Sequence, residues 1–198
     1  YREGDLRAAL DCYSQALSQD NQDPVLWAGV AACFSRLGEY QDAAESYRRA
    51  IRLRDNVARY QTGMAYCERQ LSNFDEAIEH HKRAIDLDPQ SSSAHAALAR
   101  TLHQCNRSED AIQHFRTAIE LSEPDSGLHA GLSSALTKVG DGVGAIAELE
   151  EAVKLRPHDA DLLVKLANAL RANKNIQKAI DCIDEALDLK PDRAAWQT

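Results

Sequence analysis

The chain repeats itself every 34 residues. Residues 74–89 match residues 40–55, 108–123, 142–157 and 176–191 at this offset, and a shorter copy begins at Leu6. Two alanine positions recur in all six copies without an insertion; they are Ala9, Ala43, Ala77, Ala111, Ala145 and Ala179, and Ala16, Ala50, Ala84, Ala118, Ala152 and Ala186. A fixed period of this length is typical of solenoids, in which each unit buries its apolar face only by stacking on its neighbours.

Each period predicts two helices joined by a tight turn. In residues 24–57, apolar residues recur at helical spacing on both sides of Gly38, which breaks the pattern. The first stripe is Trp27, Val30, Ala31 and Phe34, and the second is Tyr40, Ala43, Tyr47, Ala50 and Leu53. The sequence therefore predicts an all-α solenoid of stacked helix-turn-helix units.

The period also predicts the domain organisation. We expect one elongated segment over residues 1–198, with a partial repeat at 1–23, full repeats at 24–57, 58–91, 92–125, 126–159 and 160–193, and the start of another at 194–198. Within the partial repeat we expect a turn at Gly4 and a helix from Asp5 to Leu17. The incomplete repeats at both ends suggest a piece cut from a longer protein.

Composition limits the classes of partner. The net charge of −8, from 23 basic and 31 acidic residues, disfavours nucleic acid as the main partner. No apolar run approaches the ~18 residues that a membrane span requires, so we expect no span. The odd number of cysteines, five, and the lack of a short-spaced pair favour reduced thiols and a reducing, cytoplasmic compartment. These cysteines are Cys12, Cys33, Cys67, Cys105 and Cys182.

The stripe residues of 24–57 and Gly38 stand at the signature spacings of a known family, and over its whole length the chain resembles the tetratricopeptide repeat. The pattern departs where the first aromatic residue becomes Gln61, His95, His129 or Leu163. The resemblance implies a right-handed α-solenoid that serves as a non-catalytic scaffold for protein–protein interaction. It also implies that the first helix of each repeat lines a concave surface.

The predicted first helices carry an unusual balance of charge. Across the five full repeats they hold seven basic residues against only Glu68 and Asp161, and all seven basic residues fall at positions that the resemblance turns inward. We therefore predict a basic groove that binds an acidic extended peptide or partner helix. Its predicted residues are Arg36, Arg59, Thr62, Tyr66, Arg69, Arg100, His103, Ser134, Lys138, Lys165, Asn168 and Arg171. The alternative, that these charges only solvate an alanine-rich face, remains open.

Small residues lie between these charges in the sequence. Gly29, Gly63 and Gly131 are examples at one inward position of three repeats. We interpret them as a smooth floor that lets the backbone of a ligand approach closely.

Other chemistries have ordinary structural explanations. The string from Gly140 to Ala145 looks like a dinucleotide fingerprint, but a helical pattern precedes it where a strand is required. His80, His81 and Glu76 could form a weak metal site, yet His81 occupies the position of Tyr47 in another repeat, which predicts a packed core histidine. No serine-protease, zincin or phosphate-loop signature is present. We expect no enzyme activity, cofactor or metal.

The same residues narrow the choice of partner. Family members that clamp the C-terminal carboxylate of chaperones use lysine, asparagine and arginine at set positions. The first such register here holds Ala28, Ala32, Gly63, Ser93 and Ala97 instead, and later registers also fail. That type of partner is therefore not expected.

Two alternatives to a peptide-binding scaffold remain. The chain could be the recruiting arm of a larger enzyme, a transferase or kinase, whose catalytic domain lies outside residues 1–198. It could also self-associate through apolar faces at its two ends, which are Leu10, Tyr13 and Leu17 at one end and Ile180, Ile183 and Leu187 at the other.

Glycine is concentrated in one repeat. Residues 126–159 hold Gly127, Gly131, Gly140, Gly142 and Gly144, five of the nine glycines in the chain. Because glycine destabilises a helix interior by up to ~1 kcal/mol relative to alanine, we expect this repeat to be the least stable.

Overall fold

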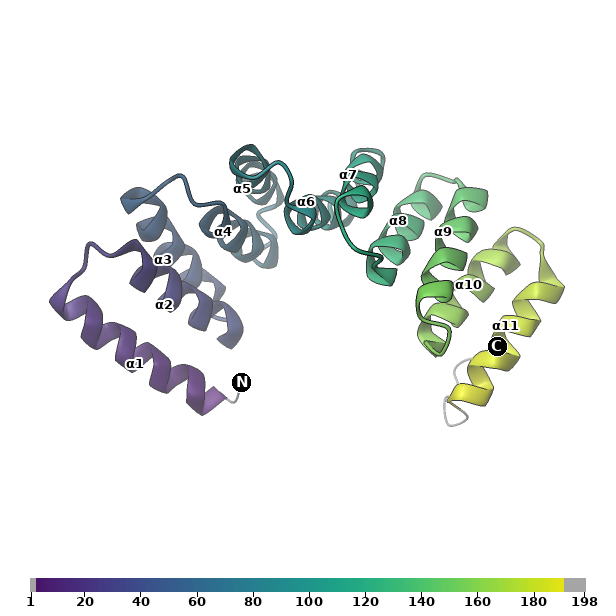
Figure 1. The fold of residues 1–198 in the computed structure, drawn as a ribbon, viewed down its shortest axis with the longest axis horizontal. Helices are drawn as coiled ribbons and strands as arrows, with labels where there is room; N and C mark the ends of the chain where they lie inside the picture. Colours follow the sequence, from purple (N-terminus) through teal and green to yellow (C-terminus); the bar gives the residue numbers. More distant parts are fainter. Residues whose placement is uncertain (1–2, 191–198) are drawn as a thin grey trace. The chain divides into compact units, whose positions relative to one another are not determined.

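The structure, a computed structural model, describes residues 3–190 of the 198. These residues form eleven α-helices and no strand (Figure 1). The helices are α1 (Glu3–Gln19), α2 (Pro24–Leu37), α3 (Tyr40–Leu53), α4 (Ala58–Gln70), α5 (Phe74–Leu87), α6 (Ser92–Gln104), α7 (Ser108–Glu120), α8 (Ser126–Lys138), α9 (Gly142–Leu155), α10 (Ala160–Ala172) and α11 (Ile176–Leu189). The predicted all-α solenoid class is confirmed.

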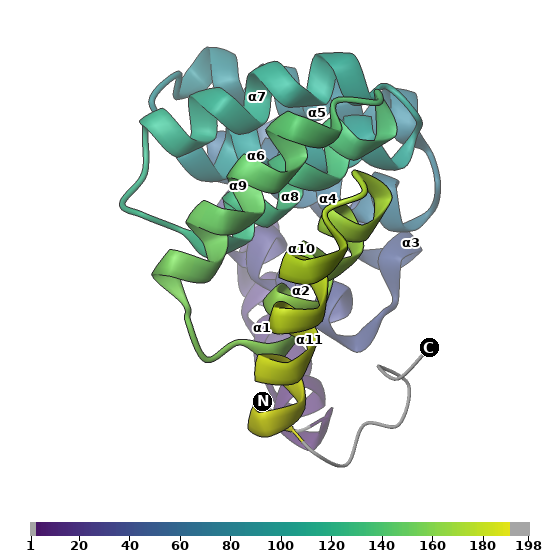
Figure 2. The same cartoon turned by 90° about the vertical axis from the view of Figure 1, so that its right-hand side faces the viewer.

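The chain divides within α6 into two compact units, one up to Thr101 and one from Leu102 onward. In the first unit, each helix from α1 to α4 packs on the next one in the chain. In the second unit, each helix from α7 to α10 does the same, and Figure 2 shows α10 and α11 side by side. We refer to α2, α4, α6, α8 and α10 as the first helices of the repeats, and to α3, α5, α7, α9 and α11 as the second helices.

The recurring alanines lie where helices approach one another. In the second helices, both alanines of every repeat are at most 6% exposed, so no larger side chain would fit without moving a helix. One core cluster shows the arrangement: Ala43 and Ala44 of α3 pack with Met64 and Cys67 of α4. The alanines that recur every 34 residues in the sequence therefore mark the positions where helices contact one another.

The turn inside each repeat has the same backbone geometry. Positive φ angles recur every 34 residues, at Gly38 (81°), Ser72 (65°), Asn106 (66°), Gly140 (87°) and Lys174 (63°). After each of these residues, the next backbone N–H donates to the carbonyl five residues earlier, at 2.8–3.0 Å. This is the Schellman ending of a helix, and it confirms the turns predicted at Gly38 and Gly140.

The turn expected at Gly4 is wrong. Helix α1 runs through this residue from Glu3, without a break. Backbone N–H groups in the first turn of a helix have no partner within the helix, and the carboxylates of Glu3 and Asp5 interact favourably with the helix dipole there. Glycine is therefore tolerated at this position. The repeat expected to start at 194–198 lies outside the described residues.

Candidate functional site

The first unit carries a pocket of about 550 Å³ on its first helices. Four predicted site residues line this first pocket: Arg36, Arg59, Thr62 and Tyr66. The other lining residues are Ala32, Ser35, Tyr47, Ala58, Gly63, Asp88, Ser91, Ser93 and Ala94. Helices α2 and α4 and the start of α6 therefore share one hollow, and the segment after α5 adds the carboxylate of Asp88.

Asp88 was not among the predicted site residues, because the prediction considered only the first helices and Asp88 follows the second helix α5. A smaller hollow of about 280 Å³ also adjoins the first pocket and shares Ala32, Tyr47 and Arg59 with it. Tyr13 of α1 and Tyr47 of α3 both line this hollow, so aromatic rings from outside the first helices contribute to the surface. These rings could have been predicted to line the surface, because aromatic residues recur at one position of the 34-residue period, as in Tyr13 and Tyr47.

Aromatic contacts connect Arg69, Tyr66 and Tyr40 in the first unit. The guanidinium of Arg69 lies 5.3 Å from the centre of the Tyr66 ring, and Gln70 Nε2 donates to the Tyr66 hydroxyl at 2.9 Å. The Tyr40 ring meets the Tyr66 ring edge-on, with ring centres 6.1 Å apart. Tyr66 is thus fixed in place at the side of the first pocket, while Arg69 supports its ring and is not a lining residue.

The second unit carries a separate pocket of about 530 Å³. It is lined by five predicted site residues: His103, Ser134, Lys138, Lys165 and Asn168. The other lining residues are Ala130, Ser133, Thr137, Leu149, Ala169 and Ala172. This second pocket joins the end of α6 to α8 and α10, and among the described residues that line it there is no aspartate or glutamate.

A chain of polar contacts crosses the second pocket. His103 Nδ1 lies 3.0 Å from Ser108 Oγ, and His103 Nε2 lies 3.1 Å from Ser134 Oγ. Lys138 Nζ donates to the backbone carbonyl of His103 at 3.4 Å. Burial, followed by the nearby charge of Lys138, lowers the pKa of His103, which favours a neutral imidazole at pH 7.

This serine–histidine contact lacks the other parts of a nucleophilic site. Ser108 presents a hydroxyl to the imidazole where a catalytic triad has a carboxylate. Ser134 lies in the middle of α8, where helical hydrogen bonds occupy the backbone N–H groups that an oxyanion hole would need. The arrangement is suited to hydrogen bonding with a ligand.

Three glycines of the expected floor are in close contact with aromatic rings. A Cβ atom built on Gly29, Gly63 or Gly131 would lie 2.5 Å, 2.3 Å or 2.7 Å from the nearest ring atom of Tyr13, Tyr47 or Phe115, respectively. Each ring comes from the helix that precedes the glycine's own helix in the chain, which is α1, α3 or α7. An aromatic ring thus packs on the backbone of each glycine. Gly63 still lines the first pocket and Gly29 the adjoining hollow, so a floor for a ligand backbone stays a prediction at these two positions, whereas Gly131 lines neither pocket.

The remaining charged residues of the first helices are dispersed. Arg100 and Arg171 are exposed and line neither pocket. Glu68 is buried and accepts a hydrogen bond from Asn73 Nδ2 at 2.7 Å, so its carboxylate is directed toward the turn after α4. Asp161 lies 3.6 Å from the ammonium of Lys190. The two pockets therefore gather the predicted site residues into two groups and leave three outside.

The paired histidines are structural. His81 is 2% exposed, which confirms the predicted packed core histidine. Burial, followed by the charges of Arg69 and Arg100, lowers the pKa of His81 to about 4. His80 Nδ1 lies 2.8 Å from Gln61 Oε1. Within residues 3–190, no group of three or more His, Cys, Asp or Glu side chains is placed to hold a metal ion.

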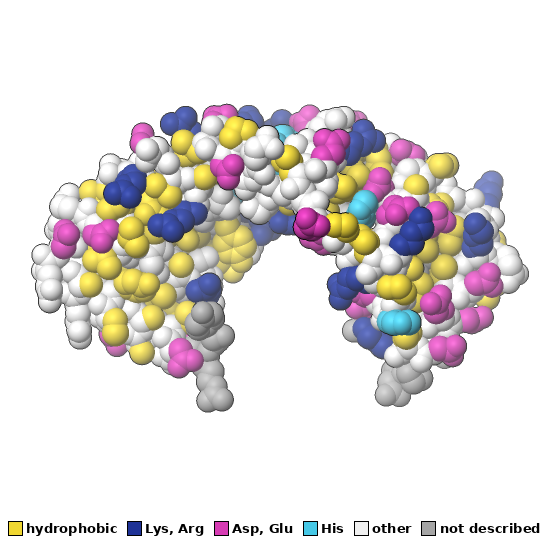
Figure 3. All heavy atoms as spheres, in the orientation of Figure 1, with side chains coloured by type: hydrophobic (Ala, Val, Ile, Leu, Met, Phe, Trp, Pro, Cys, Tyr) yellow, Lys and Arg dark blue, Asp and Glu magenta, His cyan; other side chains and the backbone are white. Residues whose placement is uncertain are grey.

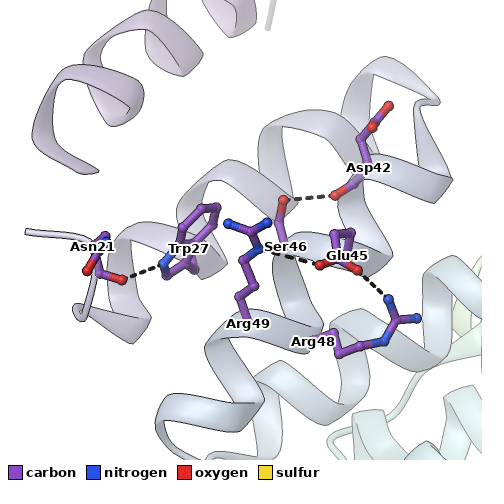
Figure 4. A network of polar contacts seen from close by, with 7 residues as sticks. All are labelled: Asn21, Trp27, Asp42, Glu45, Ser46, Arg48 and Arg49. Atoms are coloured by element: carbon purple, nitrogen blue, oxygen red, sulfur yellow. Dashed lines mark hydrogen bonds and ion pairs between the residues drawn. The ribbon is translucent and has the colours of Figure 1, made fainter. Parts of the chain in front are cut away.

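Some basic residues on the second helices are paired with acids, among them Arg48, Arg49, Lys82 and Lys154. In α3, Glu45 accepts from both Arg48 and Arg49 (Figure 4). The Arg49 guanidinium also lies 4.5 Å from the Trp27 ring, whose Nε1 donates to the carbonyl of Asn21 at 2.9 Å. Figure 3 shows acidic and basic side chains interspersed on the face toward the viewer. Lys165 in the second pocket has no such partner among the described residues, and Lys178 on α11 has none there either.

Comparison with known proteins gives matches to one family. The family profile described as tetratricopeptide repeat matches residues 52–191, and a second profile of the same description matches residues 1–67. The sequence matches none of the curated proteins with which we compared it. No helix within residues 3–190 combines the length and apolar character needed to cross a membrane.

Solved structures share the fold at low sequence identity. YrrB, described as a TPR protein with an unusual peptide-binding site, is 20% identical, with a TM-score of 0.77 over 95% of this chain and 97% of that chain. MamA from Desulfovibrio magneticus is 15% identical, with a TM-score of 0.80 over 86% of this chain and 97% of that one. PilF of Pseudomonas aeruginosa is 19% identical, with a TM-score of 0.80 over 98% and 88% of the two chains.

Proposed function

Because the chain belongs to the tetratricopeptide repeat family, we propose that it is a non-catalytic scaffold whose first helices bind an acidic extended peptide or helix of a partner protein. One observation carries the proposal: nine of the twelve residues predicted from the sequence line two pockets, one on each unit. Pockets of this size hold side chains of a peptide, and basic lining residues favour acidic ones.

The charge distribution supports an acidic ligand. The chain as a whole carries a net charge of −8, whereas the first helices carry more basic than acidic residues. Arg59 contributes a guanidinium to the first pocket, and its contact is with the Tyr60 ring, 5.3 Å from the ring centre. Lys138 and Lys165 contribute ammonium groups to the second pocket. A guanidinium stacked on a ring keeps its N–H edge available for a carboxylate.

A structural neighbour makes a peptide ligand reasonable. YrrB is described as having a peptide-binding site, and 97% of its chain aligns with this one. At 20% identity this likeness shows the fold alone, so the choice of ligand is argued from the pockets. The predicted peptide carries aspartate or glutamate at the residues that enter them.

The experiment is a selection from a library of random twelve-residue peptides on the immobilised 198-residue protein. We expect enrichment of aspartate and glutamate. The selected peptides should then bind a variant with Arg59, Arg69 and Arg100 changed to glutamate about 10- to 100-fold more weakly, since exposed ion pairs contribute roughly 0.2–1 kcal/mol each and reversal adds repulsion.

A matched control changes the same number of charges elsewhere in the same unit. Arg52, Arg54 and Arg83 are exposed, and none belongs to the first helices. Changing these three residues to glutamate should leave peptide affinity within about threefold of the wild-type value, because long-range charge effects are screened beyond ~10 Å. The proposal is wrong if no peptides are enriched, or if both triple variants bind the selected peptides equally.

Self-association is a second candidate, favoured by the exposed apolar face of α11. Ile176 is 52% exposed and Ile180 is 47% exposed, which is unusual for large aliphatic side chains. Sedimentation equilibrium of the wild type and of Ile180→Glu would decide this. Self-association is rejected if the wild type is a monomer at all concentrations. It is supported if the wild type dimerises and Ile180→Glu does not.

A further inference from the structure

We propose that the second pocket is a subsite for one anionic side chain of the partner, a carboxylate or a phosphate, held between Lys138 and Lys165 with Ser134 and Asn168 as neutral donors. The inference rests on the proposed function, because it states what one pocket of the binding surface recognises. These residues do not form the chaperone carboxylate clamp described above, since no register of three consecutive repeats in this chain holds its set of lysine, asparagine and arginine.

Uncompensated charge is the first argument. Lys165 Nζ and the Asn168 amide have no hydrogen bond or ion pair to any other described residue, and Lys138 Nζ has only the neutral carbonyl of His103 at 3.4 Å. Lys82 and Lys154 on second helices are each paired with a glutamate one turn away, whereas Lys178 on α11 has no ion pair with a described residue and lines neither pocket. The second pocket is distinguished by two lysines without such an ion pair in one lining. An oxyanion in the second pocket would therefore meet two ammonium groups without competition from a lining acid.

The lining of the pocket is the second argument. Ala130, Leu149, Ala169 and Ala172 form an apolar wall beside the polar groups. Such a wall suits the methylene groups that connect a carboxylate or phosphate to a peptide backbone. With about 530 Å³ available, the pocket has room for a whole side chain as well as its charged group. The first pocket differs, since Asp88 lies with Arg36 and Arg59 in its lining.

The imidazole of His103 positions the neutral donor. A neutral imidazole has one N–H, so it donates to one of its two serine neighbours and accepts from the other. When Nε2 carries the proton, it donates to Ser134 Oγ and leaves the Ser134 hydroxyl free to donate into the pocket. When Nδ1 carries it, the Ser134 hydroxyl donates to Nε2 and is unavailable. An anion should therefore select the Nε2-protonated tautomer, which makes His103 a positioning residue.

The test is an NMR titration of the 198-residue protein with two side-chain analogues at constant ionic strength. Acetate represents an acidic residue, and methyl phosphate represents a phosphorylated serine. We expect saturable shifts at Ser134, Lys138, Lys165 and the Asn168 side-chain amide. Affinity should fall roughly tenfold in Lys138→Gln and in Lys165→Gln, because each removes a charge-assisted hydrogen bond.

Lys178→Gln is the matched control. Lys178 lies on α11 in the same unit, is exposed and does not line the pocket. Its loss removes the same charge from the same unit and should leave affinity unchanged. Dispersed amide spectra establish that each variant is folded before its affinity is compared.

The two analogues distinguish the two sources of the anion. Saturation by acetate at least as tight as by methyl phosphate supports an acidic residue, and tighter saturation by methyl phosphate supports a phosphorylated one. Shifts that stay linear with concentration, or that respond equally to all three lysine variants, overturn the subsite. A His103 imidazole whose ¹⁵N shifts do not move toward the Nε2-protonated form on saturation overturns its positioning role. This titration uses no peptide, so a negative result would reject the subsite without rejecting the proposed function, which the peptide selection tests separately.

Discussion

The ring of Phe115 stands 2.7 Å from the point that a Cβ atom on Gly131 would occupy. Phe115 lies on α7 and is 1% exposed, and Gly131 lies in the interior of α8. The ring of one repeat therefore packs directly on the backbone of the next. This contact explains why a glycine, which destabilises a helix, occurs in the middle of α8. From the sequence alone, the same glycine is interpreted as room for a ligand backbone.

Gly131→Ala should lower the free energy of unfolding by about 1–3 kcal/mol, although alanine is the better helix former by up to ~1 kcal/mol. We expect a loss of stability because the Phe115 ring is buried and cannot turn outward to make room for the added methyl group. Urea denaturation measures the change. In a Phe115→Leu background the same substitution should cost less, since leucine stands at the equivalent position in Leu149. An unchanged or increased stability of Gly131→Ala would contradict the packing argument.

Gly63→Ala should cost less than Gly131→Ala. The added Cβ atom would lie 2.3 Å from Tyr47, yet Tyr47 is only partly buried and lines the first pocket, so its ring can turn outward. The same urea series compares the two variants. A larger loss for Gly63→Ala would mean that the Tyr47 ring is held more firmly than its exposure indicates.

Stability should fall as the pH is lowered from about 6.5 to 4 because of His81. Its pKa falls from 6.5 to about 4 on folding, so in this window the unfolded chain binds a proton that the folded chain does not. At about 1.4 kcal/mol per pKa unit, the loss reaches roughly 2 kcal/mol at pH 5. His81→Leu should remove this part of the pH dependence. Urea midpoints of both proteins at pH 7 and pH 5 measure it, and equal pH dependence in the two would reject the assignment to His81.

Lys174→Gly should raise the free energy of unfolding by about 0.5–1 kcal/mol. Lys174 has a φ of 63° at the turn position where Gly38 and Gly140 occur, and a side chain is strained in that conformation. The greater flexibility of glycine in the unfolded chain offsets part of this gain. Asn106→Gly is the control, because asparagine tolerates positive φ and should gain less. Thermal denaturation that ranks the two variants in the opposite order would be inconsistent with this account.

Amide hydrogen exchange should be faster in residues 139–147 than in the equivalent residues 71–79. The difference should be greatest near Gly142 and Gly144, which lie in the first turn of α9, where Gly142 replaces the partly buried Phe74 of α5. Gly127 and Gly140 also lie outside a helix interior, so the expected weakness of residues 126–159 is concentrated at the start of α9. Exchange measured by NMR with equal protection in the two segments would refute the prediction.

The Arg100→Ala variant should weaken the binding of an acidic peptide and reduce its dependence on salt. Because Arg100 is exposed and lines neither pocket, the loss should be smaller than for Lys165→Ala, about two- to fivefold. Fluorescence anisotropy with a labelled selected peptide at two salt concentrations measures both effects. Affinity and salt dependence that match the wild type would place Arg100 outside the binding surface.

The repeat architecture could be predicted because it depends on local patterns that occur many times. Ala43 and its equivalents mark helix contacts, and Gly38 and Gly140 mark turns that require positive φ. The same turn geometry at Ser72 and Lys174 could not be recognised from residue type. There the packing of the flanking helices imposes the conformation on residues that would not adopt it alone.

Helical periodicity assigns each residue to a face, so the amino-acid sequence alone predicts that the helices recur in phase and which side chains lie on the first helices. Which of these side chains meet was established by the tertiary structure. It brought His103 to Ser134, 31 residues apart, joined Asp88 to Arg59 in one pocket, and assigned Gly131 to the Phe115 ring. The reason is that the spacing within one helix fixes direction, whereas contact between helices depends on how their side chains interdigitate, and no single repeat contains that information.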